Sequence, residues 1–118
     1  MTTVLIVDAR SEMRQALREL LTRGGLAVTG EAANIADAVC QVRRLTPDLA
    51  LVDLSLPGIN GLTGIQHLRS ARPKLQIILI TMYYSRALHA AAIAAGAQDC
   101  MPKDELDLAW VQSWAPTR

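Results

Sequence analysis

Five short apolar runs, each followed by a segment with helical spacing of its apolar residues, organise this chain from end to end. The runs are rich in Val, Ile and Leu, which is typical of strands buried on both faces of a sheet. We expect strands at residues 3–7, 26–32, 48–54, 75–80 and 98–101. We expect helices from Ser11 to Gly24, from Asn34 to Leu45, from Leu62 to Pro73, from Ser85 to Gly96 and from Asp104 to Trp114. Regular alternation of strand and helix predicts an α/β fold, a doubly wound five-stranded parallel sheet flanked by five helices.

Length and charge place this sequence among ordinary globular domains. Its 118 residues match one domain, residues 1–118, with residues 115–118 as a tail or the start of a linker. Twelve basic and eleven acidic side chains give a formal charge of +1. Because a nucleic-acid-binding surface needs a clear excess of basic residues, we expect no direct nucleic-acid binding by these residues.

The sequence predicts a cytoplasmic location. It opens directly on a strand-like run, so no signal peptide is expected, and it has no apolar stretch of the roughly 18 residues that a membrane span requires. Cys40 and Cys100 lie far apart in the sequence and have no partners at metal-binding spacing. They are therefore expected to be free thiols in a reducing compartment.

Polar residues stand where four of the expected strands end. The first strand ends on Asp8, the third on Asp53 and the fourth on Thr81, and Lys103 follows the fifth. In open α/β sheets the carboxyl ends of the strands form the ligand-binding edge, so these four groups are expected to converge. Paired carboxylates suit Mg²⁺, and a carboxylate can also attack phosphorus. The set therefore indicates phosphoryl transfer.

The same residues carry a family resemblance. The segments LIVD (5–8), LVDLSLPGINGL (51–62), LIT (79–81) and AAGAQDCMPK (94–103), with their spacing, resemble the receiver domain of bacterial two-component response regulators. The resemblance covers the whole chain. It implies the flavodoxin-like (CheY-like) fold with sheet order 2-1-3-4-5. It also implies a signalling domain of a phosphorelay and not an enzyme with a turnover substrate.

The resemblance also implies roles for individual residues. Asp53 would be the phosphoacceptor, Thr81 would hydrogen-bond the phosphoryl group, and Lys103 would pair with a phosphoryl oxygen. Asp8, Asp53 and the backbone carbonyl of Ser55 would hold Mg²⁺. A sensor histidine kinase would supply the phosphoryl group, and a DNA-binding output domain outside this sequence would carry transcriptional control.

Ala9 is the main departure from the family pattern, which usually has a second acid at that place. The missing acid is a direct metal ligand in the family, so we expect weak binding of Mg²⁺ here. One lost charge-assisted ligand corresponds to about 2 kcal/mol, or roughly thirtyfold in affinity. This loss would slow phosphorylation without abolishing it.

Three further departures concern the switch and its surroundings. Cys100 stands where many receivers have an aromatic switch residue. Met82 follows Thr81 in place of a small residue, and could narrow access to Asp53. Lys103 is preceded by Pro102 and lacks the proline that usually follows it in the family.

Two alternatives to a phosphoacceptor domain remain open from the sequence. Ala9, Met82 and Cys100 also fit a degenerate receiver that acts as a phosphorylation-independent binding or dimerisation module. A flavin- or nucleotide-binding protein fits poorly, because the loop after the first strand lacks a phosphate cradle. Trp110 and Trp114 belong either to the core or, for Trp114, to an interface with a homodimer partner or an output domain.

Overall fold

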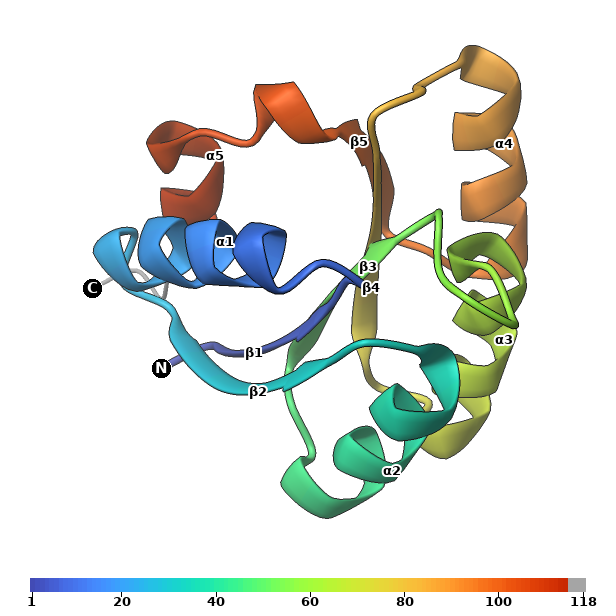
Figure 1. The fold of residues 1–118 in the computed structure, drawn as a ribbon, viewed down its shortest axis with the longest axis horizontal. Helices are drawn as coiled ribbons and strands as arrows, with labels where there is room; N and C mark the ends of the chain where they lie inside the picture. The colour runs from blue at the N-terminus through green and yellow to red at the C-terminus, as the bar shows by residue number, and fades with distance from the viewer. Residues whose placement is uncertain (115–118) are drawn as a thin grey trace.

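The computed structural model describes residues 1–114 and confirms the alternation of strands and helices (Figure 1). The strands are β1 (Thr3–Val7), β2 (Ala27–Ala32), β3 (Leu49–Asp53), β4 (Gln76–Thr81) and β5 (Asp99–Pro102). The helices are α1 (Ser11–Arg23), α2 (Ile35–Leu45), α3 (Gly61–Ala71), α4 (Arg86–Ala95) and α5 (Leu108–Gln112), with a short 3₁₀ helix η1 (Lys103–Glu105) before α5. The prediction of a tail or linker at residues 115–118 falls outside the described residues.

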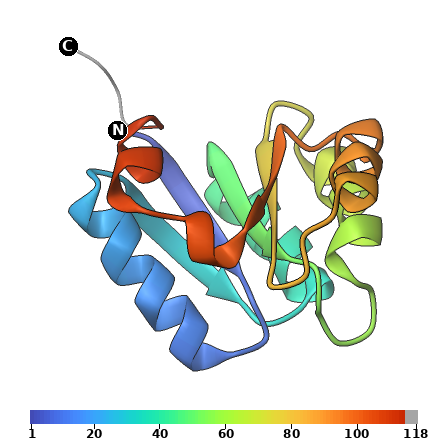
Figure 2. The same ribbon diagram turned by 90° about the horizontal axis from the view of Figure 1, so that it is seen from above.

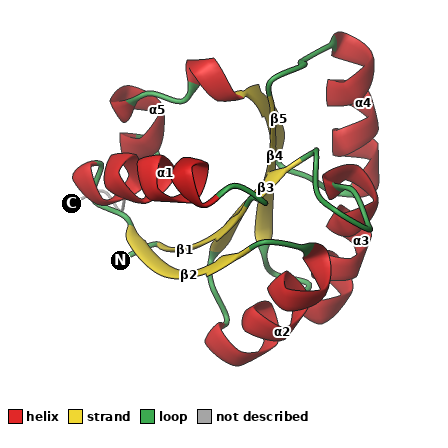
Figure 3. Ribbon diagram, viewed as in Figure 1, coloured by secondary structure: helices red, strands yellow, loops and turns green. Residues whose placement is uncertain are grey.

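The five strands form one parallel sheet in the order β2-β1-β3-β4-β5, as the family resemblance implies. Helices α1 and α5 cover one face, and α2, α3 and α4 cover the other (Figures 1 and 3). In the view from above, α1 and α5 lie side by side (Figure 2), and the two helices are in contact.

Each face of the sheet has its own hydrophobic core. Side chains that alternate along the strands point to opposite faces, because a strand has a period of two residues. Leu5 and Val7 pack under α2 and α3, whereas Val4 and Ile6 pack under α1 and α5. Burial on both faces explains why the strands read as continuous apolar runs in the sequence.

Strand register places the polar residues at one edge of the sheet. Asp53, the last residue of β3, pairs with Ile80, and Thr81 pairs with Pro102. Strand β5 lies at the edge of the sheet, and no further strand lies on its outer side. A proline, which has no N–H to donate, is tolerated in such an edge strand. The loop that carries Lys103 therefore begins beside the ends of β3 and β4.

The final segment differs from the single amphipathic helix expected over residues 104–114. Leu106 has extended backbone angles (φ −77°, ψ 105°), which separates η1 from α5. Asp107 then starts the new helix, because its side chain accepts a hydrogen bond from the backbone N–H of Trp110 at 2.8 Å. Trp110 and Trp114 both pack against the core under α1.

The start of α1 also differs in detail from expectation. The helix begins at Ser11, as expected, but the preceding residue, Arg10, is its capping residue and makes no side-chain cap bond. Over residues 1–114, none of the helices combines the length and the apolar character that crossing a membrane needs.

Candidate functional site

Three of the predicted site residues meet directly at the carboxyl ends of the strands. The Lys103 ammonium lies 2.8 Å from a carboxylate oxygen of Asp8 and 3.2 Å from one of Asp53. Asp8 is fully buried, and Asp53 is only 6% exposed. Buried carboxylates are costly unless they are paired, so the single ammonium that bridges them stabilises both.

The carboxylate of Asp8 has partners on both of its oxygens. Oδ2 accepts the bond from Lys103, and Oδ1 accepts a bond from the backbone N–H of Arg10 at 2.9 Å. The Arg14 guanidinium donates to the backbone carbonyl of Asp8 at 2.6 Å. These bonds fix both the side chain and the main chain of Asp8 where β1 ends.

The surroundings of Asp53 raise the pKa of its carboxyl group. Burial raises the pKa of Asp53, the nearby Lys103 ammonium lowers it, and the Asp8 carboxylate raises it again, with a net result above the ordinary value. A hydrogen bond from the Ser55 backbone N–H also favours the ionised form. The elevated pKa shows that the carboxylate is desolvated and faces a like charge.

Thr81 ends the neighbouring strand and makes no hydrogen bond to Asp8, Asp53 or Lys103. It ends β4, next to Ile80, the register partner of Asp53, and it is 1% exposed. Its hydroxyl oxygen accepts a bond from the backbone N–H of Tyr83 at 2.9 Å. The hydroxyl proton therefore remains available to donate to another oxygen.

A cavity of about 190 Å³ opens over the Asp53 carboxylate. It is lined by Arg10, Asp53, Ser55, Met82, Tyr83 and Lys103. Met82, which we expected to narrow access to Asp53, is one of these lining residues and is 60% exposed. Arg10 and Tyr83 were not among the predicted site residues. The only sequence signal for Arg10 was a basic residue two places after a strand-ending acid.

The oxygen atoms of this site suit a divalent cation. Asp53 and Ser55 line the same cavity, and Asp8 is joined to Asp53 through Lys103. Hard oxygen donors of this kind fit Mg²⁺. Within residues 1–114, however, no three His, Cys, Asp or Glu side chains gather as a metal-binding cluster. The residues therefore fit the ion, with fewer acids than a strong site has.

Cys100 is buried at the position where the family commonly has an aromatic switch residue. The side chain is 1% exposed and belongs to the core under α2, α3 and α4. Burial raises the pKa of the Cys100 thiol, and the Asp99 carboxylate raises it further. The thiol is therefore a protonated core group, and the aromatic side chains near the site come from the loop after β4 instead.

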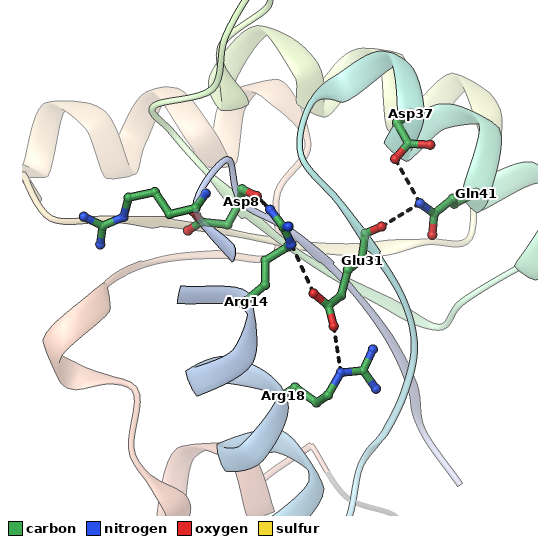
Figure 4. A network of polar contacts seen from close by, with 7 residues as sticks. Asp8, Arg14, Arg18, Glu31, Asp37 and Gln41 are labelled. Carbon is green, nitrogen blue, oxygen red and sulfur yellow. Dashed lines mark hydrogen bonds and ion pairs between the residues drawn. The ribbon is translucent and has the colours of Figure 1, made fainter. Parts of the chain in front are cut away.

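A polar network connects the end of β1 to β2, α1 and α2 (Figure 4). Glu31 of β2 accepts bonds from Arg14 at 3.1 Å and from Arg18 at 2.7 Å. Its backbone carbonyl accepts a bond from Gln41, which also donates to Asp37. Because Arg14 also binds the carbonyl of Asp8, the network orients the strand end that carries the site.

Replacing Glu31 with glutamine is expected to cost about 1 kcal/mol of the free energy of unfolding at neutral pH, the scale of a partly exposed ion pair. Burial raises the pKa of Glu31, but hydrogen bonds and charges from Arg18 and Arg14 outweigh it and lower the pKa below the ordinary 4.5. The ionised carboxylate therefore contributes stability above pH 4.5, and this stability is lost as the pH falls through the lower folded-state pKa.

Urea unfolding of both proteins at pH 7 and at acidic pH measures this difference. The difference in the free energy of unfolding between wild type and Glu31→Gln should disappear as the pH drops below 4.5. Glu19→Gln is the matched control, because Glu19 is exposed on α1 and forms no ion pair with residues 1–114. A gap that stays constant with pH would contradict the assigned charge interaction.

Comparison with protein families gives one match that spans most of the chain. The model described as "Response regulator receiver domain" matches residues 4–109. The segment includes all of the residues that line the cavity and the two buried acids.

Individual relatives and solved structures agree with that match. The chain is 36% identical to the chemotaxis protein CheY of Thermotoga maritima over 100 residues, which are 85% of this chain and 83% of CheY. It is 36% identical to the DNA-binding transcriptional activator DevR/DosR of Mycobacterium tuberculosis, over 88% of this chain but only 48% of that protein. A Burkholderia pseudomallei response regulator, solved with a phosphorylated aspartic acid, a calcium ion and citrate, superposes with a TM-score of 0.85 at 26% identity. That match covers 99% of this chain and 68% of the other.

Proposed function

The chain belongs to the response regulator receiver domain family, and on this premise we propose that Asp53 accepts a phosphoryl group from a sensor histidine kinase. Receiver domains are signalling domains, so the product is a modified protein and not a released metabolite. The observation that carries the proposal is the buried Asp8–Lys103–Asp53 contact at the floor of a cavity.

The reaction follows from the position of these groups. A carboxylate oxygen of Asp53 attacks phosphorus and forms a P–O bond. The P–N bond of the phosphohistidine breaks, and its electron pair goes to the imidazole nitrogen, which takes a proton from water. Lys103, which already contacts Asp53 at 3.2 Å, pairs with a phosphoryl oxygen, and the Thr81 hydroxyl donates to another.

Asp8, Asp53 and the backbone carbonyl of Ser55 would hold Mg²⁺ at this site. When bound, the ion would supply positive charge to the phosphoryl oxygens. With Ala9 in place of a second acid, we propose that the affinity for the ion is low. The two bonds that Asp8 already accepts, from Arg10 and Lys103, compete with the ion for its oxygens.

Phosphorylation would act by changing the loops after β4 and β5. Addition of a phosphoryl group draws the Thr81 hydroxyl away from its contact with Tyr83 and changes the partners of Lys103. Both residues lead into exposed segments, so the change reaches a surface that another protein could read. We propose that this surface controls either a DNA-binding output domain or a homodimer, in the cytoplasm. The longer relative DevR/DosR, a DNA-binding transcriptional activator, supports the first of these.

Incubation with acetyl phosphate and Mg²⁺, followed by intact-mass spectrometry, tests the function. The expected result is a mass gain of one phosphoryl group that hydroxylamine removes, as it does from acyl phosphates. The matched control is Asp53→Asn, which keeps the shape of the side chain and should show no gain. No gain in the wild-type protein at any Mg²⁺ concentration would contradict the proposal and favour a phosphorylation-independent binding module.

A further inference from the structure

Arg10 brings a second cation to the cavity over Asp53. Its backbone N–H donates to Asp8, and this exposed residue lines the cavity together with Asp53 and Lys103. The guanidinium forms no ion pair or hydrogen bond with any other residue of the described chain, 1–114. A charged side chain that lines a cavity without a protein partner is free to bind a ligand of opposite charge.

With Arg10 counted, the charges of the site leave only about one excess negative charge after phosphorylation. Before phosphorylation, the acids Asp8 and Asp53 are balanced by the bases Lys103 and Arg10. Phosphorylation replaces the single charge of Asp53 with a phosphoryl group of nearly two negative charges. The modified site then has a net charge of about minus one without any metal ion.

A receiver with the usual second acid reaches the same charge only with a metal. If position 9 held an acid and position 10 a neutral residue, the phosphorylated site would carry about three negative charges. A divalent cation would bring that site back to about minus one. In this chain Ala9 removes one negative charge and Arg10 adds one positive charge, so the two neighbouring residues together replace the charge of the ion.

We propose that Arg10 is a phosphoryl-binding residue that allows Asp53 to be phosphorylated without a divalent cation. A guanidinium is suited to this role because it is always charged and its planar donors pair with two oxygens of a phosphate group. The inference rests on the proposed function. It identifies Arg10 as the residue whose charge replaces that of Mg²⁺, and it predicts that phosphorylation of Asp53 depends less on the metal ion.

Intact-mass time courses with acetyl phosphate, in EDTA and in Mg²⁺, test the inference. The Asp53 oxygen forms its bond to phosphorus while the bond from phosphorus to the acyl oxygen breaks, and acetate leaves with the electron pair. The wild-type protein should be phosphorylated in EDTA. Arg10→Ala should lose at least about tenfold in that rate, the loss expected for one charge-assisted hydrogen bond, and should recover when Mg²⁺ is added.

Matched variants test whether the effect depends on the positive charge of Arg10 and on its position at the cavity. Arg44→Ala also removes an arginine from an exposed position, but it lies on α2 away from the cavity, and it should leave both rates unchanged. Arg10→Lys should recover part of the metal-free rate, because it restores the charge without the planar pair of donors. Thermal melting of each variant checks that it is folded.

Calorimetric titration with Mg²⁺ gives a readout that does not depend on phosphorylation. Arg10→Ala should bind Mg²⁺ several-fold more tightly, since a repelling positive charge is gone, and Ala9→Asp should do the same by adding a ligand. If Arg10 only supported the local structure, Arg10→Ala would weaken both Mg²⁺ binding and phosphorylation.

Each remaining outcome overturns a specific claim. Phosphorylation of the wild-type protein that stops completely in EDTA would overturn the role of Arg10 and leave the proposed function standing. Equal rates of phosphorylation for Arg10→Ala and wild type in EDTA would also overturn the role of Arg10 alone. Absence of phosphorylation under both conditions would overturn the function itself, and the inference with it.

Discussion

Lys103→Met is expected to lower the free energy of unfolding by about 3 kcal/mol at neutral pH. The Lys103 ammonium bridges Asp8 and Asp53 at 2.8 and 3.2 Å, and both carboxylates are buried. Methionine has similar length but no charge, so it leaves two like charges facing one another with little water between them. The loss of a shared partner is therefore larger than the loss of an ordinary surface ion pair.

Urea unfolding compares this variant with Lys74→Met, which removes the other lysine of the chain from an exposed position and should change stability little. Adding Asp53→Asn to Lys103→Met should recover part of the loss, because it removes one of the two opposing charges. A loss below about 1 kcal/mol would contradict the assigned role, since it would match a surface pair and not a buried bridge.

The strands and the edge that holds the site follow from the sequence for a simple physical reason. A parallel sheet is buried on both faces, so each strand must be apolar until it emerges, and the first polar residue marks its carboxyl end. That rule placed Asp8, Asp53 and Thr81 at one edge of the sheet, and the structure places them there. The strand order came from the family resemblance, because the apolar pattern alone does not distinguish it.

Other features depend on side-chain directions and local backbone angles that the pattern does not encode. The contact of Lys103 with Asp8 joins residues 95 positions apart in sequence and depends on the path of the loop after β5. Arg10 stands two positions after Asp8 in the sequence, and only the structure shows that this exposed residue lines the cavity over Asp53. The last helix was predicted too long because its apolar spacing continues through Leu106, whose extended backbone interrupts the helix.

Gly61 is packed directly against the backbone of the candidate site. It begins α3, and its N–H donates to the carbonyl of Leu54 at 2.9 Å. A Cβ at this position would lie 2.1 Å from the backbone carbonyl oxygen of Asp53 and 2.9 Å from a methyl group of Leu79. The start of α3 is therefore packed against the main chain of Asp53, with no room for any side chain.

Gly61→Ala is accordingly expected to cost about 3 kcal/mol of the free energy of unfolding, at the upper end of overpacking effects. The backbone of Asp53 must move to admit the methyl group, so the rate of phosphorylation by acetyl phosphate should fall as well. Gly58→Ala is the matched control in the same loop: a Cβ there meets nothing within 4 Å. Its positive φ of 77° should alone cost about 1 kcal/mol. Urea unfolding and intact-mass time courses measure both effects. Equal losses in the two variants would contradict the close contact with the Asp53 backbone as the cause of the larger cost at position 61.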